Sequence, residues 1–226
     1  MVAMIEPLAI DSAFAEHCEI HFESLGRVPY AQAFALQQKL HEERCLGKIA
    51  DTVLLLEHPP VITKGRRAAD QDFIVAPEQL KARGFAIEEG HRGGTLTYHG
   101  PGQLVVYFIF SLDARRLSIP QFVKKIEATL IATLAGFGID AASGKEEPGI
   151  WVQDRKIASL GLSVNRGISM HGAALNVATN LKDFAVIVPC GVQNCQMTSM
   201  ESELKQKLSL QEVEHCLRKS IIREFV

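Results

Sequence analysis

The sequence lacks the features that mark membrane-spanning, secreted or disulfide-bonded proteins. Its longest uninterrupted apolar run, residues 104–110, has seven residues, whereas a helix that crosses a bilayer needs about 20. The first eleven residues contain no lysine or arginine, so the basic start of a secretory signal is missing. The cysteines are odd in number and form no C-x-x-C pair: Cys18, Cys45, Cys190, Cys195 and Cys216. They predict reduced thiols, and we expect a cytoplasmic protein that does not enter a membrane.

An excess of charge of either sign is also missing. The 226 residues include 24 Lys and Arg against 26 Asp and Glu, a net charge of −2, which gives no electrostatic footprint for nucleic acid. Apolar residues make up 47% and charged residues 22%, a balance that excludes wholesale disorder. No repeat, low-complexity tract or Pro/Gly/Ser-rich linker divides the chain, so we expect a single domain over residues 1–226.

Several common functional motifs are incomplete. Residues 138–146 resemble a phosphate-binding loop, but five residues separate its two glycines and Glu146 replaces the required Ser or Thr. Residues 41–45 begin like a zinc-protease helix, but Cys45 stands where the second histidine belongs. Residues 100–102 lack the third glycine of a dinucleotide loop, and no G-x-S-x-G elbow exists. Because the eight histidines are scattered, we expect neither a metal site nor a bound cofactor.

Hydrophobic spacing predicts helices and strands without strict alternation. We expect helices at residues 30–46, 77–83 and 119–137, and strands at residues 52–56, 103–110, 149–152, 156–164 and 168–177. A C-terminal helix follows Ser209, which is expected to form a capping box with Glu212. Its apolar stripe, which should dock on the sheet, consists of Val213, Leu217, Ile221 and Phe225. Because the elements do not alternate as βαβ units, we expect an α+β (mixed α/β) fold.

The first segment that can carry chemistry is the glycine-rich stretch at residues 92–103. Its four glycines and one proline let the backbone approach a ligand closely and leave amide N–H groups exposed. Arg92 can bind an anion there, and His99 offers a hydrogen bond. The alternative is a glycine-rich hairpin that binds nothing.

The second segment, residues 154–161, contains Lys156. On a regularly alternating strand, Lys156 shares a face with the apolar residues at positions 158, 160 and 162. A lysine at the edge of an apolar face loses water, which lowers its pKa toward values useful in acid–base catalysis. The alternative is a lysine at a strand end whose charged head reaches solvent.

Two shorter segments complete the set. Residues 171–176 place small residues beside His171, which leaves room for a slender ligand. Further along, Cys190 stands between Pro189 and Gly191, a sequence typical of a sharp turn that presents the thiol. A cysteine needs a basic or cationic neighbour to become a thiolate, and Lys156 and His171 are the candidates. A buried, inert thiol is the alternative interpretation.

Together these segments resemble one family, the octanoyltransferases of lipoate biosynthesis. The resemblance spans about residues 22–200, in order and at the family's spacings, and leaves residues 1–20 outside as an N-terminal extension. Its other matching parts are Leu25-Gly26, Tyr30, Gln37, residues 55–63 and Gly65-Arg66. One departure is Asn180-Leu181, where the family usually has Asp-Leu.

The resemblance implies a fold and a set of site residues. The fold is a central mixed sheet flanked by helices, shared with the catalytic domains of lipoate and biotin protein ligases. Cys190 matches the family's nucleophile, and Lys156 matches its general acid and base. The residues implied to bind substrate are Arg92, Gly93, Gly94, Thr95, Leu96, Thr97, Tyr98, His99, Ser159, Leu160, Gly161, Gly172, Ala173 and Ala174.

The resemblance also implies a reaction and its partners. An octanoyl group passes from octanoyl-acyl carrier protein to a lysine of a lipoyl domain through a thioester on Cys190, without ATP. The acceptors are the lipoyl domains of 2-oxoacid dehydrogenases and the glycine cleavage H protein. We expect a monomer that binds no nucleic acid. Candidate docking charges for acidic partners are Arg66-Arg67, Arg115-Arg116 and Lys124-Lys125.

Two other functions fit the same fold. An ATP-dependent lipoate or biotin protein ligase needs no nucleophilic cysteine, so the Pro189-Cys190-Gly191 match argues against it. An inactive scaffold that only binds carrier protein or lipoyl domains needs neither Cys190 nor Lys156. A single acylation assay separates all three.

Overall fold

The computed structural model of the chain describes residues 19–144, 148–188 and 195–226. Its strands are β1 (Ile20–Arg27), β2 (Asp51–Glu57), β3 (Val61–Lys64), β4 (Ala86–Glu89), β5 (Leu96–His99), β6 (Gln103–Ile109), β7 (Ala142–Ser143), β8 (Gly149–Val152), β9 (Arg155–Asn165), β10 (Ile168–Asn176) and β11 (Gln196–Met197). Its α-helices are α2 (Tyr30–Cys45), α3 (Pro77–Ala82), α4 (Ile119–Ala135), α5 (Met200–Leu204) and α6 (Leu210–Phe225).

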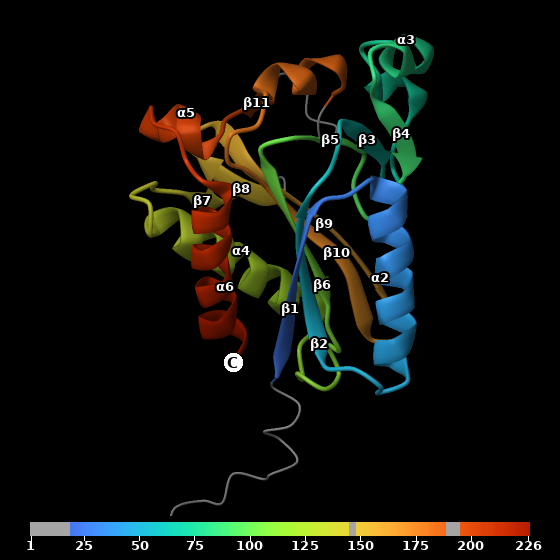
Figure 1. Cartoon of the computed structure of the whole chain (residues 1–226), viewed down its shortest axis with the longest axis vertical. Coiled ribbons are helices and arrows are strands. Elements are labelled where there is room, and N and C mark those ends of the chain that lie inside the picture. Colours follow the sequence, from blue (N-terminus) through green and yellow to red (C-terminus); the bar gives the residue numbers. More distant parts are fainter. Residues whose placement is uncertain (1–18, 145–147, 189–194) are drawn as a thin grey trace, which may run out of the picture.

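The described part of the chain forms a mixed sheet between two helical layers. The eight strands of this sheet follow the order β1-β2-β6-β10-β9-β8-β7, and β11 pairs with β9. Helix α2 covers one face, whereas α4 and α6 cover the other, and the smaller sheet β4-β3-β5 lies at one end (Figure 1). The expected mixed sheet flanked by helices is confirmed. None of the described helices is long and apolar enough to cross a membrane.

The central strand β6 separates the two main cores. Val106 and Phe108 face the larger core beneath α4 and α6, whereas Val105 and Tyr107 face the smaller core beneath α2. Strands β2 and β10 flank β6, and both pair with it in antiparallel register. Because both faces are covered, the apolar run of β6 is continuous rather than alternating.

Several strands were not predicted. Strand β1 pairs in parallel with β2 at the edge of the large sheet, and the apolar–polar alternation of its first four residues was the available signal for it. Strands β7 and β11 have only two residues each. The strands of the smaller sheet have four residues each, which is too short for a periodic signal. Its core is a separate cluster around Ile62, Leu96 and Tyr98.

The predicted capping box at the C-terminal helix is not formed. Ser209 is the N-cap of α6 as expected, but its side chain accepts no capping hydrogen bond. Gln211 and Glu212 are exposed in this first turn, so water can reach the N–H groups that the box would have bound. A complete capping box forms at α4 instead, between Ser118 and Gln121.

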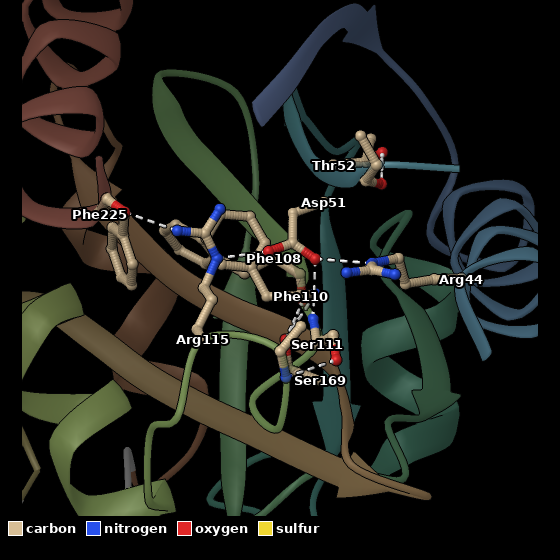
Figure 2. Close-up of polar contacts among 11 residues, drawn as sticks. Arg44, Asp51, Thr52, Phe108, Phe110, Ser111, Arg115, Ser169 and Phe225 are labelled. Carbon is tan, nitrogen blue, oxygen red and sulfur yellow. Dashed lines mark hydrogen bonds and ion pairs between the residues drawn. The ribbon is translucent and has the colours of Figure 1, made fainter. Parts of the chain in front are cut away.

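A buried carboxylate joins four elements at the end of the sheet away from β3, β4 and β5 (Figures 1 and 2). The Asp51 side chain, at the start of β2, accepts a hydrogen bond from Arg44 Nε at 2.7 Å and another from Arg115 Nε. The backbone N–H of Ser111 donates to the same carboxylate at 2.8 Å. Arg115 also donates to the carbonyl of Phe225 at 2.6 Å. Asp51 thereby ties β2 to α2, to the loop after β6 and to the end of α6.

Candidate active site

A cavity of about 270 Å³ lies between the smaller sheet and the strands β9 and β10. Thirteen of the fourteen predicted substrate-binding residues line it: Arg92, Gly93, Gly94, Thr95, Leu96, Thr97, His99, Ser159, Leu160, Gly161, Gly172, Ala173 and Ala174. Segments about 70 residues apart in the sequence therefore face one space. The volume is at the low end for small-molecule sites, which suits a slender ligand.

Tyr98 is the predicted residue that the structure places elsewhere. Its ring meets Phe184 edge-on, with 5.2 Å between the ring centroids, and its hydroxyl donates to Asp183 at 2.9 Å. The reason is the alternation of β5, which points Thr97 and His99 to one side and Tyr98 into the core of the smaller sheet. Tyr98 is therefore a packing residue.

Five further residues line the cavity: Tyr30, Arg67, Tyr107, Pro148 and His171. Tyr30 and His171 lie inside segments that the sequence analysis singled out, but they were not assigned to the site. Tyr107 is the one polar side chain in an otherwise apolar run, which was the available signal for it. Arg67 was named only as a candidate docking charge, and nothing in the local sequence marks Pro148.

The glycine-rich loop is fastened to its neighbours by backbone hydrogen bonds. Gly65 N–H donates to Thr95 O at 2.9 Å, and Gly93 N–H donates to Leu162 O at 3.1 Å. A side chain at Gly65 would put a Cβ 2.3 Å from the carbonyl oxygen of Gly94, so this approach requires glycine. The loop therefore forms a fixed wall of the cavity.

Arg92 holds this wall in place, rather than reaching out for an anion as we expected. It is buried, and its Nη2 donates to both the carbonyl and the hydroxyl oxygen of Thr63 at 2.8 Å. Its Nη1 donates to Gly93 O at 2.8 Å. These contacts connect the loop to β3. The side chain also crosses Gly161, where an added Cβ would lie 2.9 Å from Arg92 Cδ.

A bulge in β9 moves Lys156 to the face opposite the predicted one. Ile150 of β8 pairs with Ala158, but Trp151 pairs with Lys156, so Ile157 is an extra residue on β9. Ile157 and Ala158 both pack into the larger core. The alternation restarts after the bulge, and Lys156 therefore shares the cavity's face with Ser159.

Lys156 is fully buried beside the cavity. Its exposed fraction is 1%, which excludes a side chain that reaches solvent. The amine lies 5.4 Å from the centroid of the Trp151 ring. Gly149 gives it room, since a Cβ there would lie 2.4 Å from Lys156 Cε. Gly149 follows the cavity residue Pro148 and pairs with the cavity residue Ser159, so the lysine chain lies next to lining residues without lining the cavity itself.

The predicted nucleophile, Cys190, lies outside the described residues. The chain returns from that segment at Cys195, whose half-buried thiol donates to Met197 Sδ at 3.9 Å. Met197 pairs with Lys156 across β11 and β9, and Thr198 N–H donates to Lys156 O at 2.9 Å. Met197 and Thr198 therefore run alongside Lys156.

His171 occupies the far part of the cavity from Lys156. Its φ of 62° is in the left-handed region, which is strained for a non-glycine residue. The backbone N–H donates to Gln37 Oε1 at 2.8 Å, and the ring stacks on Phe34 with 5.7 Å between centroids. Within the described part of the chain, its buried Nε2 has no hydrogen-bond partner.

The titratable rings around the cavity are uncharged at neutral pH. Burial lowers the pKa of His171 to about 3 and that of His58 to about 4. Burial also raises the pKa of Tyr30 to about 12 and that of Tyr107 well above its ordinary value. These directions follow from the cost of moving charge out of water. The histidine and tyrosine rings therefore present neutral hydrogen-bonding groups, and the charge at the cavity comes from Arg67 and Arg92.

The structure allows a sharp test of the cavity as an acyl site. Gly93 has ordinary φ, and a Cβ there would meet Leu162 O at 3.6 Å, so the position accepts a Cβ without a backbone shift and Gly93→Val adds bulk to the wall. Because the residue lies next to Leu162, far from Lys156, we expect this variant to slow transfer of octanoyl groups about 10-fold more than transfer of butanoyl groups. Equal losses for both chain lengths, measured as kcat/KM, would contradict the assignment.

Ala158→Leu is the matched control for this test. Ala158 is fully buried in the larger core and is not among the residues that line the cavity. Overpacking at Ala158 should lower the midpoint of thermal unfolding and reduce both activities alike.

The fold and cavity define a class of protein. The lipoate-protein ligase A whose crystal structure contains ATP superposes with a TM-score of 0.72 at 16% identity, covering 91% of this chain and 85% of that one. The biotin protein ligase of Aquifex aeolicus, in complex with biotin and ATP, gives 0.55 at 13% identity, covering 91% and 70%. At these identities the likeness establishes the fold of the lipoate and biotin protein ligases.

Comparison of sequences narrows the class. The model of the lipoyl protein ligase A/B catalytic domain matches residues 29–222. The octanoyltransferase of Acidobacterium capsulatum is 42% identical, covering 89% of this chain and 88% of the relative. That of Dictyoglomus thermophilum is 40% identical, covering 88% and 84%. The chain belongs to the lipoyl protein ligase A/B catalytic-domain family and, within it, to the octanoyltransferases, which are acyltransferases of lipoate biosynthesis.

Proposed function

We propose that the protein transfers an octanoyl group from octanoyl-acyl carrier protein to a lysine of a lipoyl domain, through a thioester on Cys190. The observation that carries this proposal is the buried amine of Lys156. It lies next to residues that line the cavity, several of which are small, and next to the strand β11. Lys156 is the general acid and base of both half-reactions in this proposal.

In the first half-reaction, the Cys190 thiolate attacks the thioester carbonyl of the donor. A bond forms between Cys190 Sγ and the acyl carbon, and the bond from that carbon to the carrier's sulfur breaks. Lys156, which holds the proton taken from Cys190, gives it to the departing carrier thiolate. The products are the acyl-enzyme, the carrier thiol and a neutral Lys156 amine.

In the second half-reaction, the acceptor lysine enters as a free amine after losing one proton to solvent. Its nitrogen attacks the acyl carbon, and the bond to Cys190 Sγ breaks. Lys156 takes the second proton from the attacking nitrogen. The cycle ends with an amide on the lipoyl domain and with the Cys190 thiolate beside the Lys156 ammonium. The exchange of a thioester for an amide is downhill, so ATP is not required.

In this proposal the acyl carrier protein and the lipoyl domain dock their acidic surfaces at the mouth of the cavity. Arg66 and Arg67 are exposed, and Arg67 lines the cavity, which makes them the docking charges best placed for it. Arg115 is excluded from that role because its guanidinium binds Asp51. Lys125 donates to the carbonyl of Glu224. The acceptors are lipoyl domains of 2-oxoacid dehydrogenases and the H protein, and we expect a monomer that acts in the cytoplasm.

Intact-mass measurement after mixing with octanoyl-carrier protein, without ATP, tests the mechanism. The expected result is one octanoyl adduct that hydroxylamine removes and that Cys190→Ala abolishes. Cys195→Ala is the matched control and should form the adduct normally, because the proposal assigns the thioester to Cys190 and the Cys195 thiol donates to Met197 Sδ. If transfer to a lipoyl domain continues at the normal rate in Cys190→Ala, the covalent mechanism is wrong. If acylation requires ATP and free octanoate, the protein is a ligase.

A further inference from the structure

A chain of buried side-chain amides connects His99 to the backbone of Lys156. His99 Nδ1 and Gln103 Oε1 are 2.7 Å apart, and Gln103 Nε2 donates to Asn176 Oδ1 at 3.0 Å. Asn176 Nδ2 in turn donates to Thr198 O at 3.0 Å. The N–H of Thr198 donates to Lys156 O at 2.9 Å. His99, Gln103 and Asn176 are all buried, so water does not compete for these bonds.

This series of hydrogen bonds determines which ring nitrogen of His99 carries the proton. A backbone carbonyl only accepts, so the group that meets Thr198 O must be the NH₂ of Asn176. Asn176 then presents Oδ1 to Gln103, so Gln103 must donate a hydrogen bond from its own NH₂ group. Its Oε1 therefore faces His99. An amide oxygen also only accepts, and therefore His99 Nδ1 bears the hydrogen. The other nitrogen, Nε2, is left with an unprotonated lone pair.

His99 stays neutral in this position and lines the cavity. Burial, with a smaller contribution from the neighbouring His58, lowers its pKa well below the ordinary value. A neutral imidazole with Nδ1 protonated offers the cavity a hydrogen-bond acceptor and no charge. The acyl chain and its thioester carbonyl have no hydrogen to donate to such an acceptor. Among the reacting groups of the second half-reaction, the acceptor amine does.

We propose that His99 Nε2 accepts a hydrogen bond from the N–H of the incoming lysine and aims its lone pair at the acyl carbon. Gln103 and Asn176 act as positioning residues that keep the His99 ring in this state. His99 takes no proton in the step: one N–H points to Nε2, and the hydrogen that leaves goes to Lys156. This inference rests on the proposed function, since it assigns a group to the second half-reaction only.

Single-turnover kinetics separate the two half-reactions. In His99→Leu we expect transfer to a lipoyl domain to slow about 100-fold, the loss expected for misplacing a reacting group by about 1 Å. Because His99 also lines the cavity, acyl-enzyme formation from octanoyl-carrier protein should slow as well, but by at least 10-fold less. His99→Gln keeps a side-chain oxygen acceptor and should recover part of the rate. Equal losses in both half-reactions, or none in the second, would overturn the proposal. Failure of the unaltered protein to form the acyl-enzyme would instead overturn the covalent mechanism.

Nitrogen-15 NMR of the histidine rings tests the positioning residues without depending on activity. In the unaltered protein at pH 7, His99 should show a protonated Nδ1 and an unprotonated Nε2. Gln103→Leu removes the acceptor of Nδ1 and should change that pattern, with a matching loss of kcat for transfer and little change in KM. A proton on Nε2 of the unaltered protein would overturn the assignment, as would a Gln103→Leu variant that keeps both the pattern and the rate.

Discussion

Replacing Lys156 with methionine should slow octanoyl transfer by about 10²- to 10⁴-fold, the range expected for loss of a general acid and base. Methionine matches the length of the lysine stem and suits a fully buried site next to the Trp151 ring. The fold should therefore survive, which circular dichroism and the midpoint of thermal unfolding will show. The rate is measured as octanoyl transfer to a lipoyl domain at pH 7.

The same variant tests whether Lys156 activates the proposed nucleophile. In the unaltered protein, iodoacetamide at pH 7 should label Cys190 several-fold faster than Cys195. The reason is that a cationic amine beside a thiol raises the fraction of that thiol present as thiolate. Lys156→Met should remove that advantage. The exposed Lys124 on α4 provides the control, since Lys124→Met should change neither the labelling nor the transfer rate. If Lys156→Met leaves Cys190 just as reactive, backbone dipoles rather than Lys156 set the pKa of the thiol.

Replacing Asp51 with alanine should lower the free energy of unfolding by about 3–5 kcal/mol, the cost of breaking a buried ion pair by removing one partner. The side chain of Asp51 is fully buried, and those of Arg44 and Arg115 are 12% and 6% exposed. The substitution leaves both guanidinium groups and the N–H of Ser111 without their shared acceptor (Figure 2). Chemical denaturation measures the loss.

An exposed ion pair serves as the control for Asp51. Arg166 and Glu42 both have more than half of their side-chain surface in solvent, so Glu42→Gln should leave stability almost unchanged. A comparable loss from the two substitutions would show that burial does not govern the Asp51 network. Since Asp51 lies at the end of the sheet away from the cavity, the folded fraction of Asp51→Ala should retain its transfer rate.

The long elements of the fold follow from the sequence because each has enough residues for a period to show. Helices α2 and α4 and strands β6 and β10 lie within one or two residues of their expected bounds. The glycine- and alanine-rich segments around Gly93, Gly161 and Ala174 identify the cavity wall for a similar reason. A small residue leaves space for a ligand whatever its distant neighbours are, so the residue type alone indicates this function.

Features that depend on a partner strand or a distant residue were decided by tertiary structure alone. The face of Lys156 was mispredicted because strict alternation assumes regular pairing, and the bulge at Ile157 arises only where β9 meets β8. The role of Arg92 depends on Thr63, 29 residues away in the sequence. The sequence by itself thus determined the family, the cavity-lining segments and the long helices and strands. Only the tertiary structure decided the side of the sheet on which Lys156 lies and the hydrogen bonds that set the state of His99, because contacts between distant residues leave no local pattern.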